Sequence, residues 1–402
     1  MAGLARLLHP RGSTSSLERL IRDTFGGYGT VSGVRVTPDS AMHMGAVYAC
    51  VLVLSQSVAQ LPLHLFRRSG DTRQRVSGQP LSRFVEEQPN EWMTAYEFKQ
   101  LIMVHLLLRG NSYWLKTRGA GGQVRELIPI SPDRIKGIEQ DALFRVFYKV
   151  KRSGSEKEID TIPGEDLLHI KGLSYDSLQG LNPIEYAREM MGLYSAAEQH
   201  GAKLFSQGTR MGGVLQHPGT LSDEAATRLR ESFNEMHSGV ANAHKTALLE
   251  EGMKWESISM TADDAQFLES RQYQRSEIAG FFRVPAHFIN DLEHATFSNV
   301  EHLDLAFVKH SLMPWLVNIE QTLRRSLLTP PEKADHYFKF IVDGILRGDS
   351  VSRAQSYQQA IMNGWLNPNE VRELEDRDPY EGGDAFRIPT NMTTVSSNQQ
   401  TP

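Results

Sequence analysis

Four histidines recur at near-regular spacing in the second half of the chain, and imidazole nitrogen is a common zinc ligand. Carboxylates in the same stretch could complete a metal site. The residues concerned are His287, His294, His302, His310, Glu293, Glu301 and Asp304. Only His302 and His310 can share a helical face, and they lie two turns apart, whereas zinc-binding pairs usually lie three to five residues apart. We therefore favour ordinary loop and surface histidines, and we expect neither a bound metal nor a cofactor.

Carboxylates and glycines elsewhere in the chain could form a metal site or a phosphate-binding loop, but their spacing fits neither. Asp263, Asp264 and Asp291 could form a magnesium cluster, but the first two are better explained as acids at the positive end of a helix. The glycines of GGYGTVSG (26–33) lack the spacing of a phosphate loop. The chain has neither a Gly-x-Ser-x-Gly nor a His-Glu-x-x-His motif. We predict no catalytic residues and expect that the protein is not an enzyme.

The composition narrows the class of protein. The chain has 402 residues, 40% of them hydrophobic, which suits a soluble globular protein of two or more domains. Its 43 basic and 48 acidic residues give a formal net charge of -5, without the basic excess of a protein that grips DNA or an anionic membrane. The single cysteine, Cys50, rules out an internal disulfide. No window is long and apolar enough to span a bilayer, so we expect no membrane partner and an intracellular origin.

The elements that must position any site begin with an α+β domain behind a loose arm at residues 1–40. We expect a buried helix over 44–59, and a second helix that opens at the Thr94–Glu97 capping box and stops at Gly110. Antiparallel strands are expected in five apolar or alternating segments. These are LPLHLFRR, NSYWLKT, VRELIPI, FRVFYKV and DLLHIKG.

The next part is helical. After a helix over 182–205, Ser222 caps a helix over 222–238, and two short strands are expected within 245–260. A helix over 262–283 follows, which predicts a helical hairpin with a β tip. The centre of this last helix, 269–277, holds one aromatic and no aliphatic residue, unlike an ordinary surface helix with an apolar stripe.

The last part of the chain combines a loop, a long helix and a small module. Pro285 ends the preceding helix, and a helix over 298–328 should be kinked at Pro314. A short strand is expected at 337–342. Two short helices, 350–362 and 368–376, have helix-turn-helix proportions, but the second is acidic, which favours a small packed module over a DNA reader.

The order of these segments resembles the portal protein family of tailed double-stranded-DNA phages, in the class common among siphophages and prophages. The resemblance covers residues 41 to about 380, and at Arg283 it departs from the family, which often has glycine before Val-Pro. It is carried by AVYACVLVLSQSVAQLPLHLFRR, LSRFVEEQPNEWMTAYEFKQLIMVHLLLRGNSYW, LHIKG, GLNPIEYA, MGGVLQHPGTLSDEAATRLRESF, KTALLEEGMKWESISMTADDAQFLESRQYQRSEIAGFFRVP, TFSNVEH, LMPWLVNIEQTL and GWLNPNEVREL.

The resemblance implies an α+β portal fold assembled as a ring, usually of twelve copies, at one vertex of the capsid. Double-stranded DNA would pass through the ring during packaging and ejection. Implied partners are the terminase large subunit, the head-tail adaptor and the major capsid protein, in the virion and, during assembly, in the host cytoplasm. The implied parts are a wing (41–220), stem helix 1 (221–238), a clip (239–261), stem helix 2 (262–285), a tunnel loop (286–297), a kinked helix with wing return (298–344), a crown (345–380) and a disordered tail (381–402).

The resemblance also implies three sets of site residues. DNA-proximal loop residues are Asn290, Asp291, Leu292, Glu293, His294, Ala295 and Thr296. Stem residues expected to pair between copies are Glu269, Arg271, Arg275 and Glu277. Clip residues expected to meet the terminase or the adaptor are Asn242, His244, Lys245, Glu251 and Lys254. Two alternatives stay open: a ring-forming structural virion protein without DNA passage, and a helix-turn-helix DNA-binding protein.

Overall fold

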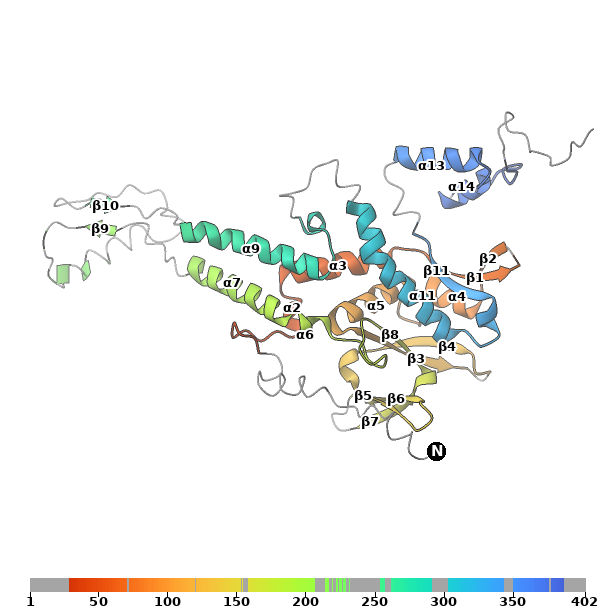
Figure 1. Cartoon of the computed structure of the whole chain (residues 1–402), viewed down its shortest axis with the longest axis horizontal. Coiled ribbons are helices and arrows are strands. Elements are labelled where there is room, and N and C mark those ends of the chain that lie inside the picture. Colours follow the sequence, from red (N-terminus) through yellow and green to blue (C-terminus); the bar gives the residue numbers. More distant parts are fainter. Residues whose placement is uncertain are drawn as a thin grey trace, which may run out of the picture. The chain divides into compact units, whose positions relative to one another are not determined.

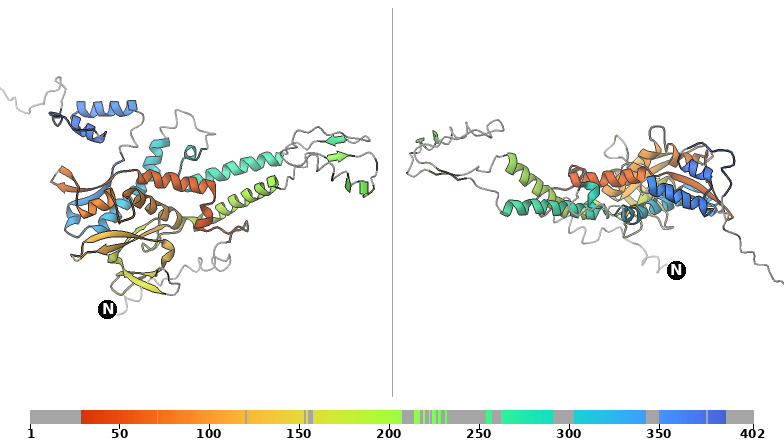
Figure 2. Two further views of the ribbon diagram at one scale, coloured as in Figure 1. Left: turned by 180° about the vertical axis from the view of Figure 1, so that it is seen from behind. Right: turned by 90° about the horizontal axis from the view of Figure 1, so that it is seen from above.

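The computed structural model describes most of residues 29–386 and separates them into two compact units. One unit comprises residues 1–47 and 184–281, and the other comprises residues 48–183 and 282–402. Figures 1 and 2 show their elements. Within 29–386, the residues outside the description are 71, 120, 153, 155–157, 207–213, 217–218, 220–221, 223, 226, 229–230, 232–253, 257–261, 291–302, 343–349 and 376.

The second unit is built on three antiparallel sheets, so the expected α+β class is confirmed. The strand orders among the described residues are β11-β1-β2, β4-β3-β8 and β5-β6-β7. The bounds are β1 Leu63–Ser69, β2 Thr72–Val76, β3 Asn111–Arg118, β4 Val124–Ile130, β5 Ile135–Gln140, β6 Val146–Lys151, β7 Ile159–Pro163, β8 Leu167–Lys171 and β11 His336–Phe340.

All five strands expected in the first part of the chain are present, but their partners were not foreseen. The segment FRVFYKV forms β6 in a different sheet from β3, β4 and β8. Strands β2, β5 and β7 were not predicted. Alternation of apolar side chains identifies a strand, whereas its partner depends on long-range contacts that alternation does not encode.

Helix α5 (Ala95–Arg109) begins and ends where the sequence predicts. The Thr94 side chain accepts from the Glu97 N–H, and Glu97 completes the capping box. Gly110 follows with a φ of 71°, in the left-handed region. A Cβ at this position would lie 1.8 Å from the Leu181 carbonyl oxygen, so only glycine fits. Helix α3 (Gly45–Ala59) is also confirmed, whereas α4 (Pro80–Glu86) was not predicted.

Most of the buried side chains of this unit are apolar. Phe98 of α5 and Trp114 of β3 are both 0% exposed, and their rings meet edge to face with centroids 4.6 Å apart. Tyr113, Ile130, Tyr148, Val150 and Leu167 form a further cluster that joins two of the sheets. Such burial stabilises each large side chain by about 1.5–3 kcal/mol relative to exposure.

A buried hydrogen-bond network ties the same two sheets together. The Nε2 atom of His169 lies 2.9 Å from Asn111 Oδ1, and its Nδ1 lies 3.1 Å from the Tyr148 hydroxyl. Because the amide oxygen only accepts, Nε2 carries the proton and Nδ1 accepts from the tyrosine. Asn111 Oδ1 also accepts from the Gly180 N–H at 2.7 Å. Burial lowers the pKa of His169 to about 3.

The irregularity expected at Pro314 takes the form of a π-helical segment, η5 (Phe307–Leu312), directly before α11 (Met313–Leu327). The Met313 N–H donates to the Val308 carbonyl, five residues back. In an ordinary helix the proline ring would clash with the carbonyl four residues earlier, and the wider turn relieves that clash. The strand β11 follows, as expected for 337–342.

The C-terminal pair of helices, α13 (Ser350–Met362) and α14 (Pro368–Leu374), agrees with the sequence. Asn367 caps α14, and Glu370 completes the capping box. The Tyr357 hydroxyl donates to Glu375 at 2.8 Å, so this acidic end of the module is used for packing.

The first unit holds α2 (Pro38–Ala41), α6 (Pro183–Tyr186), α7 (Arg188–Ser206), β9 (Val214–Gln216), β10 (Lys254–Glu256) and α9 (Ala262–Phe281). Strands β9 and β10 pair antiparallel, and α7 packs against α9 (Figures 1 and 2). The expected hairpin paired α9 with a helix over 222–238; most of that range lies outside the described residues, so this pairing stays a prediction. One boundary between the two units falls at 183/184.

Two features are absent from the described residues. None of their helices is both long and apolar enough to cross a membrane. In the same part of the chain, no three histidine, cysteine or acidic side chains come together as potential metal ligands.

Candidate functional site

The α7–α9 pair of the first unit is held by a thin apolar seam and by polar contacts. On α7, Met191 and Tyr194 are buried, at 0% and 6% exposure. Arg271 of α9 pairs with Glu198 of α7, with 3.3 Å between Nη2 and Oε1. Both side chains are more than a third exposed, so this pair adds at most about 1 kcal/mol.

The centre of α9 is polar in the structure, as its sequence predicts. Among residues 269–277 only Gln274 is buried, at 8% exposure, and Tyr273 beside it is 70% exposed. Among the described side chains of α9, the buried apolar ones are Ile278 and Ala279, near its end. A helix with this distribution leaves most of its central surface available to another molecule.

A hollow of about 430 Å³ lies on this surface. It is lined by Leu193, Glu269, Ser270, Tyr273, Gln274 and Glu277. The buried Oε1 of Gln274 has no hydrogen-bond donor among the described residues. Within that part of the chain neither glutamate of the hollow has an ion pair. The hollow therefore presents acceptors and an exposed ring, and a donor such as a guanidinium would satisfy it.

The chain leaves α9 through a residue with unusual backbone geometry. Arg283 has a φ of 56°, a left-handed conformation that glycine adopts far more easily. Its carbonyl accepts from the Ser311 hydroxyl at 2.5 Å, which fixes the turn within the second unit. Arg283 is the position at which the sequence departs from the glycine of the resembling family.

The base of the loop after Pro285 is anchored at the start of the long helix. A 3-10 turn, η4 (Ala286–Ile289), ends at Asn290, which is exposed with a φ of 61°. The Nε2 atom of His287 lies 3.1 Å from Asp304 Oδ1. The Phe288 ring lies 4.8 Å from the Phe307 ring, centroid to centroid. Of the seven loop residues predicted to lie near DNA, Asn290 is described, and 291–296 lie outside the described residues.

Comparison with known proteins supports the family that the sequence resembles. The model of the phage portal protein family matches residues 45–376. The chain belongs to the phage portal protein family.

Two portal proteins and one solved particle are similar over most of the chain. The probable portal protein of Streptomyces phage phiC31 is 35% identical, covering 92% of this chain and 82% of that protein. The portal protein of Enterobacteria phage HK97 is 29% identical, covering 89% and 84%. The neck of a native gene transfer agent particle, computed with C12 symmetry, matches with a TM-score of 0.58 at 22% identity, covering 92% and 96%.

The stem residues predicted from the resemblance to portal proteins have different surroundings in the structure. Glu269 and Glu277 line the same hollow, whereas Arg271 has an intrachain partner, Glu198. Arg275 is half-buried on the same helix. Among the predicted clip residues, Lys254 is exposed on β10, opposite Gln216 of β9. Residues 242, 244, 245 and 251 lie outside the described part of the chain.

Of the candidate metal ligands, the structure brings His287 and Asp304 together as a pair. His310 is exposed on η5, and residues 291, 293, 294, 301 and 302 lie outside the description. Sequence reasoning missed Leu193, Gln274 and Glu198 as parts of the α7–α9 surface. The polar centre of α9 could have indicated this surface from the sequence. The sequence did not indicate that α7 is the partner helix of α9.

Proposed function

We propose that this portal protein assembles into a closed ring at one vertex of a phage capsid, with double-stranded DNA passing through the centre during packaging and ejection. A ring of twelve copies would match the symmetry of the similar gene transfer agent neck. The observation that carries the proposal is the family match over residues 45–376. We assign no catalytic role and no cofactor to the chain.

The polar centre of α9 supports a ring. In a head-to-tail ring every subunit presents one surface to its neighbour and receives another. The hollow with Glu269, Gln274 and Glu277 would then receive a donor from the adjacent copy, and Arg275 is a candidate on the same helix. This arrangement would supply a donor to Gln274 Oε1, which has none among the described residues.

The remaining parts have proposed roles by analogy with the family. The α7–α9 pair would form the stem, and the β9–β10 pair would belong to the clip that meets the terminase large subunit and the head-tail adaptor. The loop 286–297 would lie nearest the DNA, residues 345–380 would form the crown, and the α+β part would form the wing that meets the major capsid protein. The ring would reside in the virion, after assembly in the host cytoplasm.

Electron cryomicroscopy of the purified full-length protein, together with native mass spectrometry, tests this proposal. We expect a closed ring with a central channel wide enough for a DNA duplex. A ring without such a channel would favour a structural virion protein. A monomer that binds one DNA sequence would favour the helix-turn-helix alternative, although the acidic α14 argues against that class.

A further inference from the structure

One face of the β11-β1-β2 sheet gathers arginines and aromatic rings. In an antiparallel sheet, directly paired residues and residues two apart share a face. Phe66 pairs with Arg75 and with Tyr337, and Arg68 pairs with Arg73. The opposite face carries the buried side chains of Leu63, Leu65, Phe338 and Phe340. We call the first face, with Phe66, Arg68, Arg73, Arg75 and Tyr337, the arginine face.

The arginines of this face are unusual in a chain with a net charge of -5. Arg68 and Arg73 lie directly opposite each other on neighbouring strands, where like charges destabilise a sheet. Neither has an ion pair among the described residues, whereas Arg75 pairs with Glu86 at 3.2 Å. A bound anion would relieve the repulsion between Arg68 and Arg73.

The rings hold these guanidinium groups in place. Arg68 lies 5.8 Å from the centroid of the Tyr337 ring, and Arg73 lies 5.9 Å from that of Phe66. The two rings stack on each other with centroids 5.7 Å apart. Cation–π contacts of this kind orient a guanidinium without neutralising it, so its donors stay available for a planar or tetrahedral anion.

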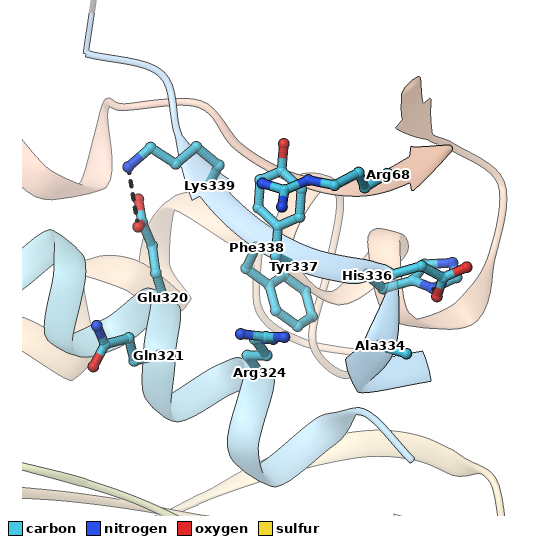
Figure 3. Close-up of a pocket in the computed structure, with 10 residues that line it drawn as sticks. Arg68, Glu320, Gln321, Arg324, Ala334, His336, Tyr337, Phe338 and Lys339 are labelled. Carbon is cyan, nitrogen blue, oxygen red and sulfur yellow. Dashed lines mark hydrogen bonds and ion pairs between the residues drawn. The ribbon is translucent and has the colours of Figure 1, made fainter. Parts of the chain in front are cut away.

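Beside the face, at β11, lies a hollow of about 320 Å³ (Figure 3). Arg68 and Arg324 both line it, and Figure 3 shows Arg68 over the Tyr337 ring. Arg324 donates to the Lys333 carbonyl, which fixes its position, and it has no ion pair among the described residues. The Asp335 carboxylate also lines the hollow and pairs with Arg67. Lys339, by contrast, pairs with Glu320 at 3.2 Å. The hollow thus adds a third fixed guanidinium to the two on the sheet.

We propose that the arginine face and the adjoining hollow bind the phosphate backbone of duplex DNA without reading its sequence. A protein partner would need a central apolar anchor. None of the large exposed apolar side chains in the described part of the chain lies on β1, β2 or β11. Arginine, by contrast, matches phosphate through paired hydrogen bonds. This surface would hold DNA, a property separate from the proposed passage through the ring and independent of it.

The test measures binding of a fluorescein-labelled 30-base-pair duplex to the full-length protein by anisotropy over a range of salt concentrations. The Arg68→Gln/Arg73→Gln variant should bind about tenfold more weakly, and the slope of log K against log salt should fall by about 1.8. The matched control is Arg83→Gln, because Arg83 is exposed on α4 and already paired with Glu87; it should leave the slope as in the parent.

A lysine variant and a competing polyanion distinguish phosphate binding from attraction to any negative charge. Arg68→Lys/Arg73→Lys retains both charges and should keep the parent slope, with affinity reduced only a few-fold. Polyglutamate of equal charge should compete poorly with the duplex. An unchanged slope in the glutamine variant would overturn the proposal, and so would polyglutamate binding as tight as that of DNA. Ring formation in the same samples reports on the proposed function separately.

Discussion

Helices α5 and α9 differ in how much of their stability comes from their own chain. Eight residues of α5 are buried, among them Phe98, which meets Trp114 in the interior of the second unit. In the described centre of α9 only Gln274 is buried, and its amide oxygen has no donor within the described residues. The described residues thus cover most of α5 and leave the centre of α9 exposed, which is the difference that the proposed ring would explain.

Replacement of one aromatic residue on each helix should give the largest contrast. Phe98→Ala removes a fully buried ring and should cost about 3–5 kcal/mol of unfolding free energy. Tyr273→Ala removes an exposed ring and should change that free energy by no more than about 0.5 kcal/mol, while weakening ring assembly. Urea unfolding and native mass spectrometry measure the two effects. Equal loss of stability in both variants would remove the distinction between the helices.

The pH dependence of stability should expose the buried network of the second unit. Histidine in an unfolded chain has a pKa of about 6.5, whereas burial lowers the pKa of His169 to about 3. Between pH 6.5 and about pH 3, this histidine is therefore protonated in the unfolded state and neutral in the folded state. The contribution of this histidine is fully present above pH 6.5 and is lost as pH falls towards 3, by about 1.4 kcal/mol per pH unit.

His169→Gln should flatten this part of the profile, although it also removes hydrogen bonds and lowers stability at pH 7. Tyr148→Phe is the matched control, because it removes one bond of the network and keeps the histidine. We expect Tyr148→Phe to cost about 1 kcal/mol at all pH values without changing the slope. Denaturant unfolding at several pH values separates these outcomes. His105, whose pKa burial lowers to about 4, should supply part of the slope that remains.

Charge reversal on α9 should have a smaller effect, directed at assembly. Arg271→Glu/Arg275→Glu should raise the concentration needed for half-assembly about tenfold, because in the proposed ring it would place negative charge opposite the acceptors of a neighbouring copy. Glu198→Ala is the control, since it breaks the intrachain pair with Arg271 and leaves both arginines in place. If Glu198→Ala impairs ring formation equally, these arginines act within one chain.

The smallest expected effect lies at the end of α9. Arg283→Gly should stabilise the protein by about 0.5–1 kcal/mol, because glycine enters the left-handed region without the cost that a side chain carries. Arg283→Lys keeps that cost and should show no gain. Thermal unfolding of both variants provides the measurement. A loss of stability in the glycine variant would mean that contacts of the arginine side chain stabilise the protein by more than its backbone conformation costs.

Local features of the fold were predictable from the sequence, and long-range pairings were not. The capping boxes at Thr94 and Asn367 and the stop at Gly110 depend on a few neighbouring residues, so their signals are complete within one segment. The choice of α7 as partner of α9 depends on segments more than fifty residues apart, which carry no local mark of each other.

The buried hydrogen-bond network of Asn111, Tyr148 and His169 also depends on long-range pairings that the sequence does not reveal. Asn111 and His169 lie in strands that were predicted, but their meeting requires the β3–β8 register and the return of the chain at Gly180. For the loop after Pro285, the sequence predicted a connection, whereas the His287–Asp304 contact at its base follows from the helix that comes later.

The π-helical segment before Pro314 holds one residue more than an ordinary helical turn. Loss of one residue from 307–312 would restore ordinary winding without rotating the residues on either side, because the wide turn already absorbs the additional residue. Asp304 would then keep its contact with His287, but the ring of Pro314 would clash with the carbonyl four residues earlier. A shortened segment and a proline at this position are therefore incompatible, and a relative that lacks the additional residue should also lack the proline.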